Sequence, residues 1–538
     1  METIQQVEGS GTPPLQTSTA TEAASPARAS TANGAAAAPW IRPRVLAWGA
    51  AFACYFAALV FVNCYWACYP TDNDLDEVGW LAANLSLARP ESLANQGYPP
   101  GLPVLLRALS PVVGSLLSAA FLWQAIASTA SVFFAFRISK ALSGRAGVGV
   151  LGALCASLAT LRVGTTEFAD GTSTALFLAG LWALTRREGD RRGFLLLGLA
   201  AGAAYLFRTH YLTLVAIVPA ALVVAGFGWR EVGRLAPAFL AGFAATAWPL
   251  WLMNCLAYGT PLHAGVSQYN IAFAMLPNAF DWEDYARTYD RWPLSRILEE
   301  RPLEFLAHMG KMARKAFGGK LVVSAAGLGI FAMLLTPERQ RRRLLAFIAG
   351  LAFFYIVVVL VPTRTTARAF APIAMLASVL VACGLAEVVS RADRPRRAQV
   401  CAALAVVFLS WPAGVWADLD SRHASRQRNE EIVDALVAHG MQSSGEVFTN
   451  IWNVYNLQDP LFVTFYNYGG WLQLDSKYAR ERPPPRASTL PEWQAFFAER
   501  GIRFVVLRQR SDTAALFQAP PPAWKQLFAD ESLTVWAL

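Results

Sequence analysis

The chain has 538 residues, of which 55% are hydrophobic and only 15% are charged, and its mean hydropathy is +0.34. These values exclude an ordinary water-soluble globular protein and indicate a multispanning membrane protein. The net charge of +9 does not indicate a nucleic-acid partner, because the Lys and Arg residues are scattered between apolar segments and form no single stripe.

The first predicted element is a disordered tail over residues 1–43, rich in Ala, Ser, Thr, Pro and Gly. It has neither the basic start nor the short apolar core of a cleaved signal peptide. Val45–Trp66 then reads as the first membrane helix, and Arg42 and Arg44 before it place the tail in the cytoplasm.

Ten further apolar segments follow the first helix. They cover approximately residues 112–136, 146–161, 170–185, 193–207, 211–228, 235–257, 319–336, 344–361, 370–389 and 398–416. Several are shorter than the ~20 residues that a perpendicular span needs, so some are expected to be broken, tilted or partly interfacial. The expected fold over residues 44–417 is a multispanning α-helical bundle of about eleven transmembrane helices.

The loops between these segments differ in charge, and every second loop collects basic residues. The basic loops hold Arg137, Lys140 and Arg145; Arg186, Arg187, Arg191 and Arg192; Arg230 and Arg234; Arg339, Arg341, Arg342 and Arg343; and Arg391, Arg394, Arg396 and Arg397. Because short cytoplasmic loops are rich in Lys and Arg, the alternate loops should be extracytoplasmic. All candidate chemistry then lies on the outer face of the cell (inner or plasma) membrane.

The first external loop, residues 69–103, carries Asp72, Asp74, Asp76 and Glu77 and ends in the proline-rich stretch Tyr98–Pro103. A carboxylate here could act as a general base toward a hydroxyl group, and the alternate spacing of the aspartates could supply oxygen ligands to a divalent cation. For Asp72 and Asp74, helix capping or surface solvation is the favoured explanation. The prolines predict a rigid turn that leads back into the membrane.

The second long external loop covers residues 259–318, and its second half resembles an amphipathic helix beginning at Pro302. One face would hold Phe305, Leu306, Met309 and Met312, and the other Glu304, Lys311, Arg314 and Lys315. Such a helix could lie in the membrane interface or pack as a loop helix with a solvated basic face.

After residue 417 the hydropathy falls, and residues 418–538 predict a small extracytoplasmic α/β domain. Strands are expected at 447–449, 462–466 and 504–507, and a helix at 491–500. The aromatic residues of this region could stack on sugar rings or simply form its core; they are Tyr455, Tyr466, Tyr468, Trp471 and Trp493. The seven cysteines lie in or beside apolar segments, and no spacing predicts a disulfide framework or a structural metal.

Four features in order resemble the GT-C superfamily of polyprenyl-phosphate-sugar-dependent glycosyltransferases, in the bacterial branch similar to protein O-mannosyltransferases and aminoarabinose transferases. They are Asp76-Glu77 before Tyr98-Pro99-Pro100-Gly101-Leu102-Pro103; Asp170 at the start of the fourth helix; Arg208 closing the fifth; and Arg368-Ala369-Phe370-Ala371-Pro372 opening a late helix. The chain departs from the pattern at Ala369-Phe370, where an aromatic residue often follows the arginine directly, and its C-terminal region shows no acceptor signature.

The resemblance implies an inverting transfer of a hexosyl or pentosyl group from a polyprenyl-phosphate-linked sugar to the hydroxyl of an envelope glycan, lipid or protein. Its implied catalytic residues are Asp76 as base, Glu77 as its partner, and Asp170. Arg208, Arg364 and Arg368 are implied to bind the donor phosphate, although Arg364 and Arg368 could instead be interfacial anchors. The acceptor and loop candidates are Tyr98, Glu167, His210 and Tyr269. No cofactor is required; a divalent cation is possible, with Asp72 and Asp74 as its weak candidates.

Two other classes fit part of the pattern. A multispanning transporter should carry ionisable or Gly/Pro-broken segments at mid-membrane and often repeated halves, whereas the charges here gather at helix ends. A non-catalytic membrane assembly protein for cell-envelope glycans remains an alternative if the external acids only cap helices. Replacing Asp76 by Asn separates these classes, because only the enzyme needs that carboxylate.

Overall fold

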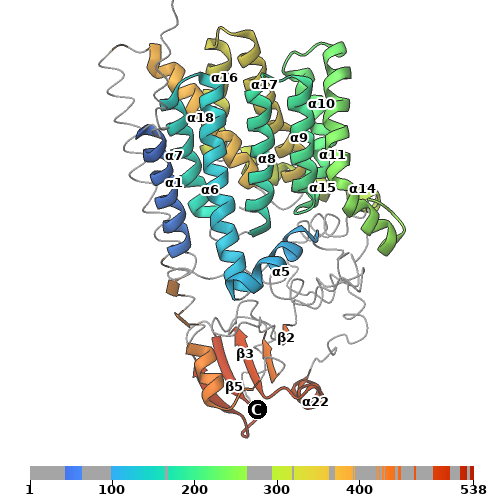
Figure 1. Cartoon of the computed structure of the whole chain (residues 1–538). Coiled ribbons are helices and arrows are strands. Elements are labelled where there is room, and N and C mark those ends of the chain that lie inside the picture. The colour runs from blue at the N-terminus through green and yellow to red at the C-terminus, as the bar shows by residue number, and fades with distance from the viewer. Residues whose placement is uncertain are drawn as a thin grey trace, which may run out of the picture. The chain divides into compact units, whose positions relative to one another are not determined.

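The computed structural model describes most of the chain between residues 43 and 391 and several shorter stretches after it. The described residues are 43–62, 99–114, 116–163, 168–262, 294–317, 320–362, 370–391, 393, 420, 423–424, 427–428, 431–442, 446–449, 466–467, 489–508, 521–529 and 533–538. Within these, all strands follow residue 446, and the part before residue 391 is helical (Figure 1).

The helices of the bundle follow the apolar segments of the sequence. They are α1 (Pro43–Phe61), α5 (Gly101–Val113), α6 (Leu116–Ser143), α7 (Ala146–Val163), α8 (Phe168–Arg186), α9 (Arg191–Tyr205), η3 (Thr209–Thr213), α10 (Leu214–Val224), α11 (Trp229–Tyr258), α14 (Leu294–Glu300), α15 (Pro302–Phe317), α16 (Lys320–Leu335), α17 (Arg339–Tyr355), η4 (Ile356–Leu360) and α18 (Ala371–Arg391).

Four helical stretches in the described part are long and apolar enough to cross a membrane. They are Ser118–Ser143, Trp229–Leu256, Arg339–Leu360 and Ala371–Arg391. The other apolar helices are shorter, as expected for segments below ~20 residues. The segment predicted at 398–416 lies outside the described residues, and the count of eleven stays a prediction.

Helices α9 and α11 approach each other through glycines. A Cβ atom on Gly198 would overlap the carbonyl oxygen of Phe239, and one on Gly242 would overlap that of Leu195. Thr246 adds a hydrogen bond across the contact, donating from Oγ1 to the Leu199 carbonyl oxygen at 2.9 Å. Small residues at such a contact let two backbones pack closely, which is typical of membrane helices.

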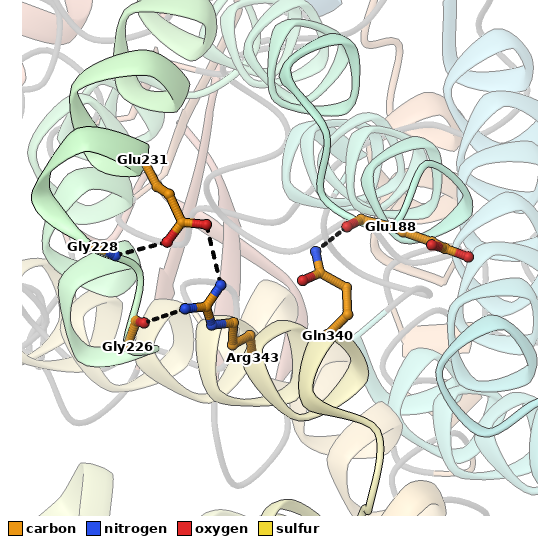
Figure 2. A network of polar contacts seen from close by, with 6 residues as sticks. All are labelled: Glu188, Gly226, Gly228, Glu231, Gln340 and Arg343. Carbon is orange, nitrogen blue, oxygen red and sulfur yellow. Dashed lines mark hydrogen bonds and ion pairs between the residues drawn. The ribbon is translucent and has the colours of Figure 1, made fainter. Parts of the chain in front are cut away.

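The turns predicted to be basic gather at one end of the bundle, which we call the arginine-rich end. Figure 2 shows the first turns of α17 reaching two other turns there: Gln340 donates to the Glu188 carbonyl, and Arg343 donates to the Gly226 carbonyl at 3.0 Å and to Glu231 at 3.2 Å. Because α8 runs from Phe168 to Arg186, residues near its start lie at the opposite end. The predicted alternation of loops agrees with this arrangement, and its assignment to the two sides of a membrane stays a prediction.

Helix α5 differs from the sequence prediction. The stretch Tyr98–Pro103 was expected as a turn before a helix at 112, but the helix already begins at Gly101. Pro103 is tolerated because the first helical turn needs no N–H donor from it. Burial of Leu102 and Leu106 against Ala119, Ala120 and Phe121 of α6 stabilises this early start.

Helix α15 begins at Pro302, as predicted. Its buried face holds Phe305 and Met312 together with His308 and Ala316. Leu306 was wrongly predicted on that face, because its side chain is 61% exposed. In a helix, neighbouring positions point about 100° apart, so residue 306 turns away from the face set by residue 305.

The C-terminal strands form one mixed sheet. Its strands are β1 (Val447–Thr449), β2 (Tyr466–Asn467), β3 (Phe504–Arg508), β4 (Lys525–Ala529) and β5 (Leu533–Ala537), in the order β2-β1-β3-β5-β4. β1 pairs in parallel with β2 and β3, whereas β5 pairs antiparallel with β3 and β4. Strands β1 and β3 and the helix α22 (Leu490–Arg500) lie at the predicted positions.

The two faces of this sheet are covered by different helices. On one face, Val447, Phe504 and Val506 pack with Ile432 and Leu436 of the helical stretch 431–438. The other face packs with α22, where Phe448 and Trp493 lie with ring centroids 5.2 Å apart. Trp493 is only 2% exposed, so it belongs to the core. Alternation of side chains along the strands produces these two faces.

Candidate active site

A buried ion pair joins Asp170 and Arg208. Asp170 lies in the first turn of α8, and Arg208 immediately precedes η3 in an extended backbone conformation. Arg208 donates from Nε to Oδ1 at 3.0 Å and from Nη2 to Oδ2 at 2.8 Å. The side chains are only 11% and 5% exposed for Arg208 and Asp170. This two-bond geometry fixes the plane of the guanidinium group against the carboxylate.

A buried ion pair of this kind contributes little to the net free energy of folding. Removing both charges from water costs several kcal/mol per ion, and their attraction offsets this only when geometry and further hydrogen bonds are favourable. Ionisable residues retained in a membrane bundle therefore indicate function by default. Asp170 and Arg208 meet this expectation, since they lie 38 positions apart in the chain yet share one buried contact.

Three ring side chains, which we call the aromatic cluster, lie beside the ion pair: His210 and Tyr211 of η3, and Tyr355 at the end of α17. The His210 ring centroid is 4.8 Å from that of Tyr211 and 5.6 Å from that of Tyr355. The charges of Asp170 and Arg208 act on all three rings. The fold therefore brings η3 and the end of α17 together beside the Asp170–Arg208 ion pair.

The aromatic cluster is buried but polar. Nε2 of His210 and the hydroxyl group of Tyr355 are shielded from solvent and have no hydrogen-bond partner among the described residues. The buried Tyr211 hydroxyl lies beside the hydroxyl groups of Thr174 and Ser173 on α8. Such groups cost free energy when they stay unpaired, so their concentration near one ion pair distinguishes this place from an ordinary apolar core.

Helix α6 closes the other side of the first turns of α8. Trp123 donates from Nε1 to the Thr172 hydroxyl at 2.8 Å. Gln124 is fully buried, and a Cβ atom on Gly171 would lie 2.7 Å from its Oε1 atom. Gly171 thus gives room to a polar side chain one residue after Asp170. The contact fixes the α8 start against α6.

The proline-rich stretch before α5 contacts the turn that leads to Arg208. The Gly101 amide donates to the Leu206 carbonyl oxygen at 2.9 Å. A Cβ atom on Gly101 would overlap that same oxygen, so the position requires glycine. Tyr98 itself lies outside the described residues, but the stretch that follows it begins beside the Arg208 turn.

The structure brings together three of the predicted site residues: Asp170, Arg208 and His210. Both oxygens of Asp170 are bound by Arg208, and two of the guanidinium nitrogens are thereby occupied. The other site residues lie outside the described part of the chain: Asp72, Asp74, Asp76, Glu77, Tyr98, Glu167, Tyr269, Arg364 and Arg368.

Sequence analysis missed Tyr355, Tyr211 and Gln124. A signal for two of them was present, because Tyr355 interrupts the apolar run 344–361 and Gln124 interrupts the run 112–136. Polar groups inside predicted spans usually face the bundle interior or a functional site. The described residues contain no group of three or more His, Cys, Asp or Glu that could hold a metal ion.

No protein-family model and no curated protein matches the sequence. Solved structures do match. ArnT from Cupriavidus metallidurans in the apo state has a TM-score of 0.59 at 13% identity, over 92% of this chain and 98% of ArnT. This chain has a GT-C-like fold. The chain also matches the structure of ArnT from Cupriavidus metallidurans bound to undecaprenyl phosphate. The TM-score is 0.51 at 13% identity, over 91% of this chain and 98% of ArnT.

A further solved structure is the arabinofuranosyltransferase AftD from Mycobacteria. It is 15% identical, with a TM-score of 0.48, and the match covers 91% of this chain and 40% of AftD. The GT-C-like fold rests on the two ArnT structures, and at 13% identity they establish the fold alone. The described helices place Asp170 and Arg208 within that fold at the end opposite the arginine-rich turns.

Proposed function

We propose that the chain is an inverting membrane glycosyltransferase. It transfers a sugar from a polyprenyl-phosphate donor to a hydroxyl group of an envelope glycan, lipid or protein on the outer face of the inner membrane. Residues 44–417 form the catalytic module, and residues 418–538 form a domain on the same outer side. The observation that carries this proposal is the buried Asp170–Arg208 ion pair at one end of a GT-C-like bundle.

The donor class is supported by the match to ArnT, one structure of which contains undecaprenyl phosphate. A lipid phosphate needs fixed positive charge at the membrane surface, and arginine offers paired donors to phosphate oxygens. Arg364 and Arg368 fill this role in our proposal. Arg208 is the third arginine of the proposed phosphate site, and its two hydrogen bonds to Asp170 set the orientation of its guanidinium group.

The reaction is a single displacement. Asp76 accepts the proton of the acceptor hydroxyl, and the hydroxyl oxygen forms a bond to the anomeric carbon. The bond between that carbon and the phosphate oxygen breaks on the opposite face, and the electron pair leaves on the polyprenyl phosphate. Glu77 holds Asp76 in place. This displacement inverts the anomeric centre and requires no cofactor.

Asp170 serves as a positioning residue and contacts no reacting atom. Its two bonds to Arg208 direct the guanidinium plane, and the aromatic cluster excludes water from the back of the pair. A buried carboxylate also lowers the free-energy cost of keeping an arginine in this place without a bound donor. When the donor phosphate arrives, the arginine is already oriented.

The direct test uses the full chain purified in detergent and a panel of radiolabelled polyprenyl-phosphate sugars with envelope lipid extract as acceptor. We expect transfer by the wild type and loss of about 100-fold or more in Asp76→Asn, in the range of removing a general base. The matched control is Glu299→Gln, an exposed carboxylate on α14. Equal rates for wild type and Asp76→Asn would remove Asp76 from the mechanism.

A further inference from the structure

A pocket of about 300 Å³ opens at the arginine-rich end of the bundle. It lies between the α8–α9 turn, the start of α11 and the first turn of α17. Its lining includes Arg187, Asp190, Phe227, Glu231, Arg234 and Gln340. This is the end opposite Asp170 and Arg208, so the pocket has no part in the proposed transfer reaction.

The walls of the pocket are held by the network in Figure 2. Arg343 bridges Glu231 and the Gly226 carbonyl, at 3.2 and 3.0 Å, and Glu231 accepts from the Gly228 amide at 2.8 Å. On the other side, Gln340 donates to the Glu188 carbonyl. The α8–α9 turn and the α10–α11 turn are thus linked through α17, which gives the pocket a preformed shape.

The lining carries both signs of charge, and one of its carboxylates, Glu231, is paired with Arg343. Arg187 and Asp190 are 3.9 Å apart and about half exposed, which leaves both able to contact a ligand. Arg234 is exposed and forms no ion pair or hydrogen bond with a described residue. Glu231 is the second carboxylate. Figure 2 shows the Glu188 side chain directed away from Gln340, so its contribution to this wall is its backbone carbonyl.

Because both signs of charge line the pocket, they favour a ligand that carries both. A purely anionic group would meet Asp190 and Glu231 at close range, and a purely cationic group would meet Arg187 and Arg234. Like charges brought together in a partly shielded site repel each other. A zwitterionic group satisfies both pairs at once.

The residues around the pocket indicate a lipid. Trp229 is 79% exposed and is the first residue of a stretch of α11 that is long and apolar enough to cross a membrane. Exposed tryptophan at the end of a span is typical of the level of lipid head groups. Phe227 and Leu235, both buried, supply the apolar part of the lining. Arg343 also lies 5.0 Å from the Phe227 ring centroid.

We propose that this pocket binds the head group of a phosphoethanolamine phospholipid. The phosphate lies between Arg187 and Arg234, and the primary ammonium donates to Asp190 and Glu231. A quaternary ammonium could not donate to these carboxylates, and it is usually held by several aromatic faces, whereas one phenylalanine lines the pocket. The lipid would seat the arginine-rich turns on the bilayer without contributing to catalysis.

The test is native mass spectrometry of the full chain in detergent, titrated with phosphatidylethanolamine, its mono- and dimethyl derivatives, phosphatidylcholine and phosphatidylglycerol. We expect one tightly held phosphatidylethanolamine and weaker binding with each added methyl group. Arg234→Gln should weaken it about tenfold, as expected for one charge-assisted hydrogen bond. Asp190→Asn keeps the oxygen that caps α9 and should weaken it similarly.

Arg342→Gln is the matched control, because Arg342 is exposed at the same end but does not line the pocket. It should bind phosphatidylethanolamine like the wild type. Two results would overturn the proposal: phosphatidylglycerol or phosphatidylcholine bound as tightly as phosphatidylethanolamine, or Arg234→Gln indistinguishable from Arg342→Gln. Neither result depends on glycosyl transfer, so the proposed function is judged separately.

Discussion

Arg208 donates from two nitrogens to both carboxylate oxygens of Asp170, at 3.0 and 2.8 Å, in a contact that is almost fully buried. The pair links the start of α8 to the turn between α9 and η3. Because both residues are held in one plane, a change in either side chain alters the direction of the other. This relationship leads to two predictions.

Arg208→Lys tests the geometry at constant charge. Lysine is a point donor without a planar fork, so it can replace one bond to Asp170 but not the parallel pair. We expect glycosyl transfer to fall by about tenfold or more, roughly the effect of losing one charge-assisted hydrogen bond in the transition state. The measurement is transfer by purified protein at matched amounts. Wild-type transfer rates in Arg208→Lys would contradict the role assigned to the paired hydrogen bonds of the guanidinium group.

A double-substitution cycle tests the burial of the pair. Asp170→Leu alone leaves the Arg208 charge buried and unpaired, which should lower the free energy of unfolding by about 3–5 kcal/mol. Asp170→Leu with Arg208→Met should recover most of this loss, because an apolar pair needs no desolvated charge. Thermal unfolding in detergent compares the variants. A double variant less stable than Asp170→Leu would show that the side chains do not compensate each other.

Gly101→Ala tests the contact between the proline-rich stretch and the Arg208 turn. The added Cβ would overlap the Leu206 carbonyl oxygen, so one backbone must move at a cost of about 1–3 kcal/mol. We expect lower transfer activity with a modest loss of stability. Gly233→Ala in α11 is the control, because a Cβ there meets no atom within 4 Å. Equal effects of the two substitutions would argue against the contact.

Tyr355→Phe tests the unpaired hydroxyl of the aromatic cluster. Removing a buried hydroxyl that has no partner among the described residues should change the free energy of unfolding by less than about 1 kcal/mol, whereas removing a bonded one costs more. Thermal unfolding of the variant measures this directly. A loss above about 2 kcal/mol would mean that the hydroxyl is bonded in the protein.

The sequence allowed the bundle and its two ends to be predicted because apolar length and arginine position are properties of each segment alone. Asp170 and Arg208 were predicted as site residues from the resemblance to the GT-C superfamily. Their direct bond was not predicted, since it depends on how α8 packs beside α9. Tyr355 interrupts the apolar run 344–361, but its place beside the ion pair depends on how α17 packs against η3, which the sequence of one segment does not show.

Rules that use only neighbouring residues predicted some helix starts and helix faces and missed others. The prolines at positions 99, 100 and 103 predicted a turn, but packing of Leu102 and Leu106 on α6 starts the α5 helix at Gly101. On α15, Pro302 marked the helix start correctly, whereas Leu306 was placed on the wrong face. A tertiary contact decided the α5 start, whereas helix geometry decided the position of Leu306.

The central claim is tested most directly by product analysis of the purified chain with a polyprenyl-phosphate sugar and an envelope acceptor. The account predicts a glycosylated acceptor of inverted anomeric configuration, one polyprenyl phosphate released for each sugar transferred, and loss of both products in Asp76→Asn at normal protein levels. Retained anomeric configuration, or full product formation by Asp76→Asn, would contradict it.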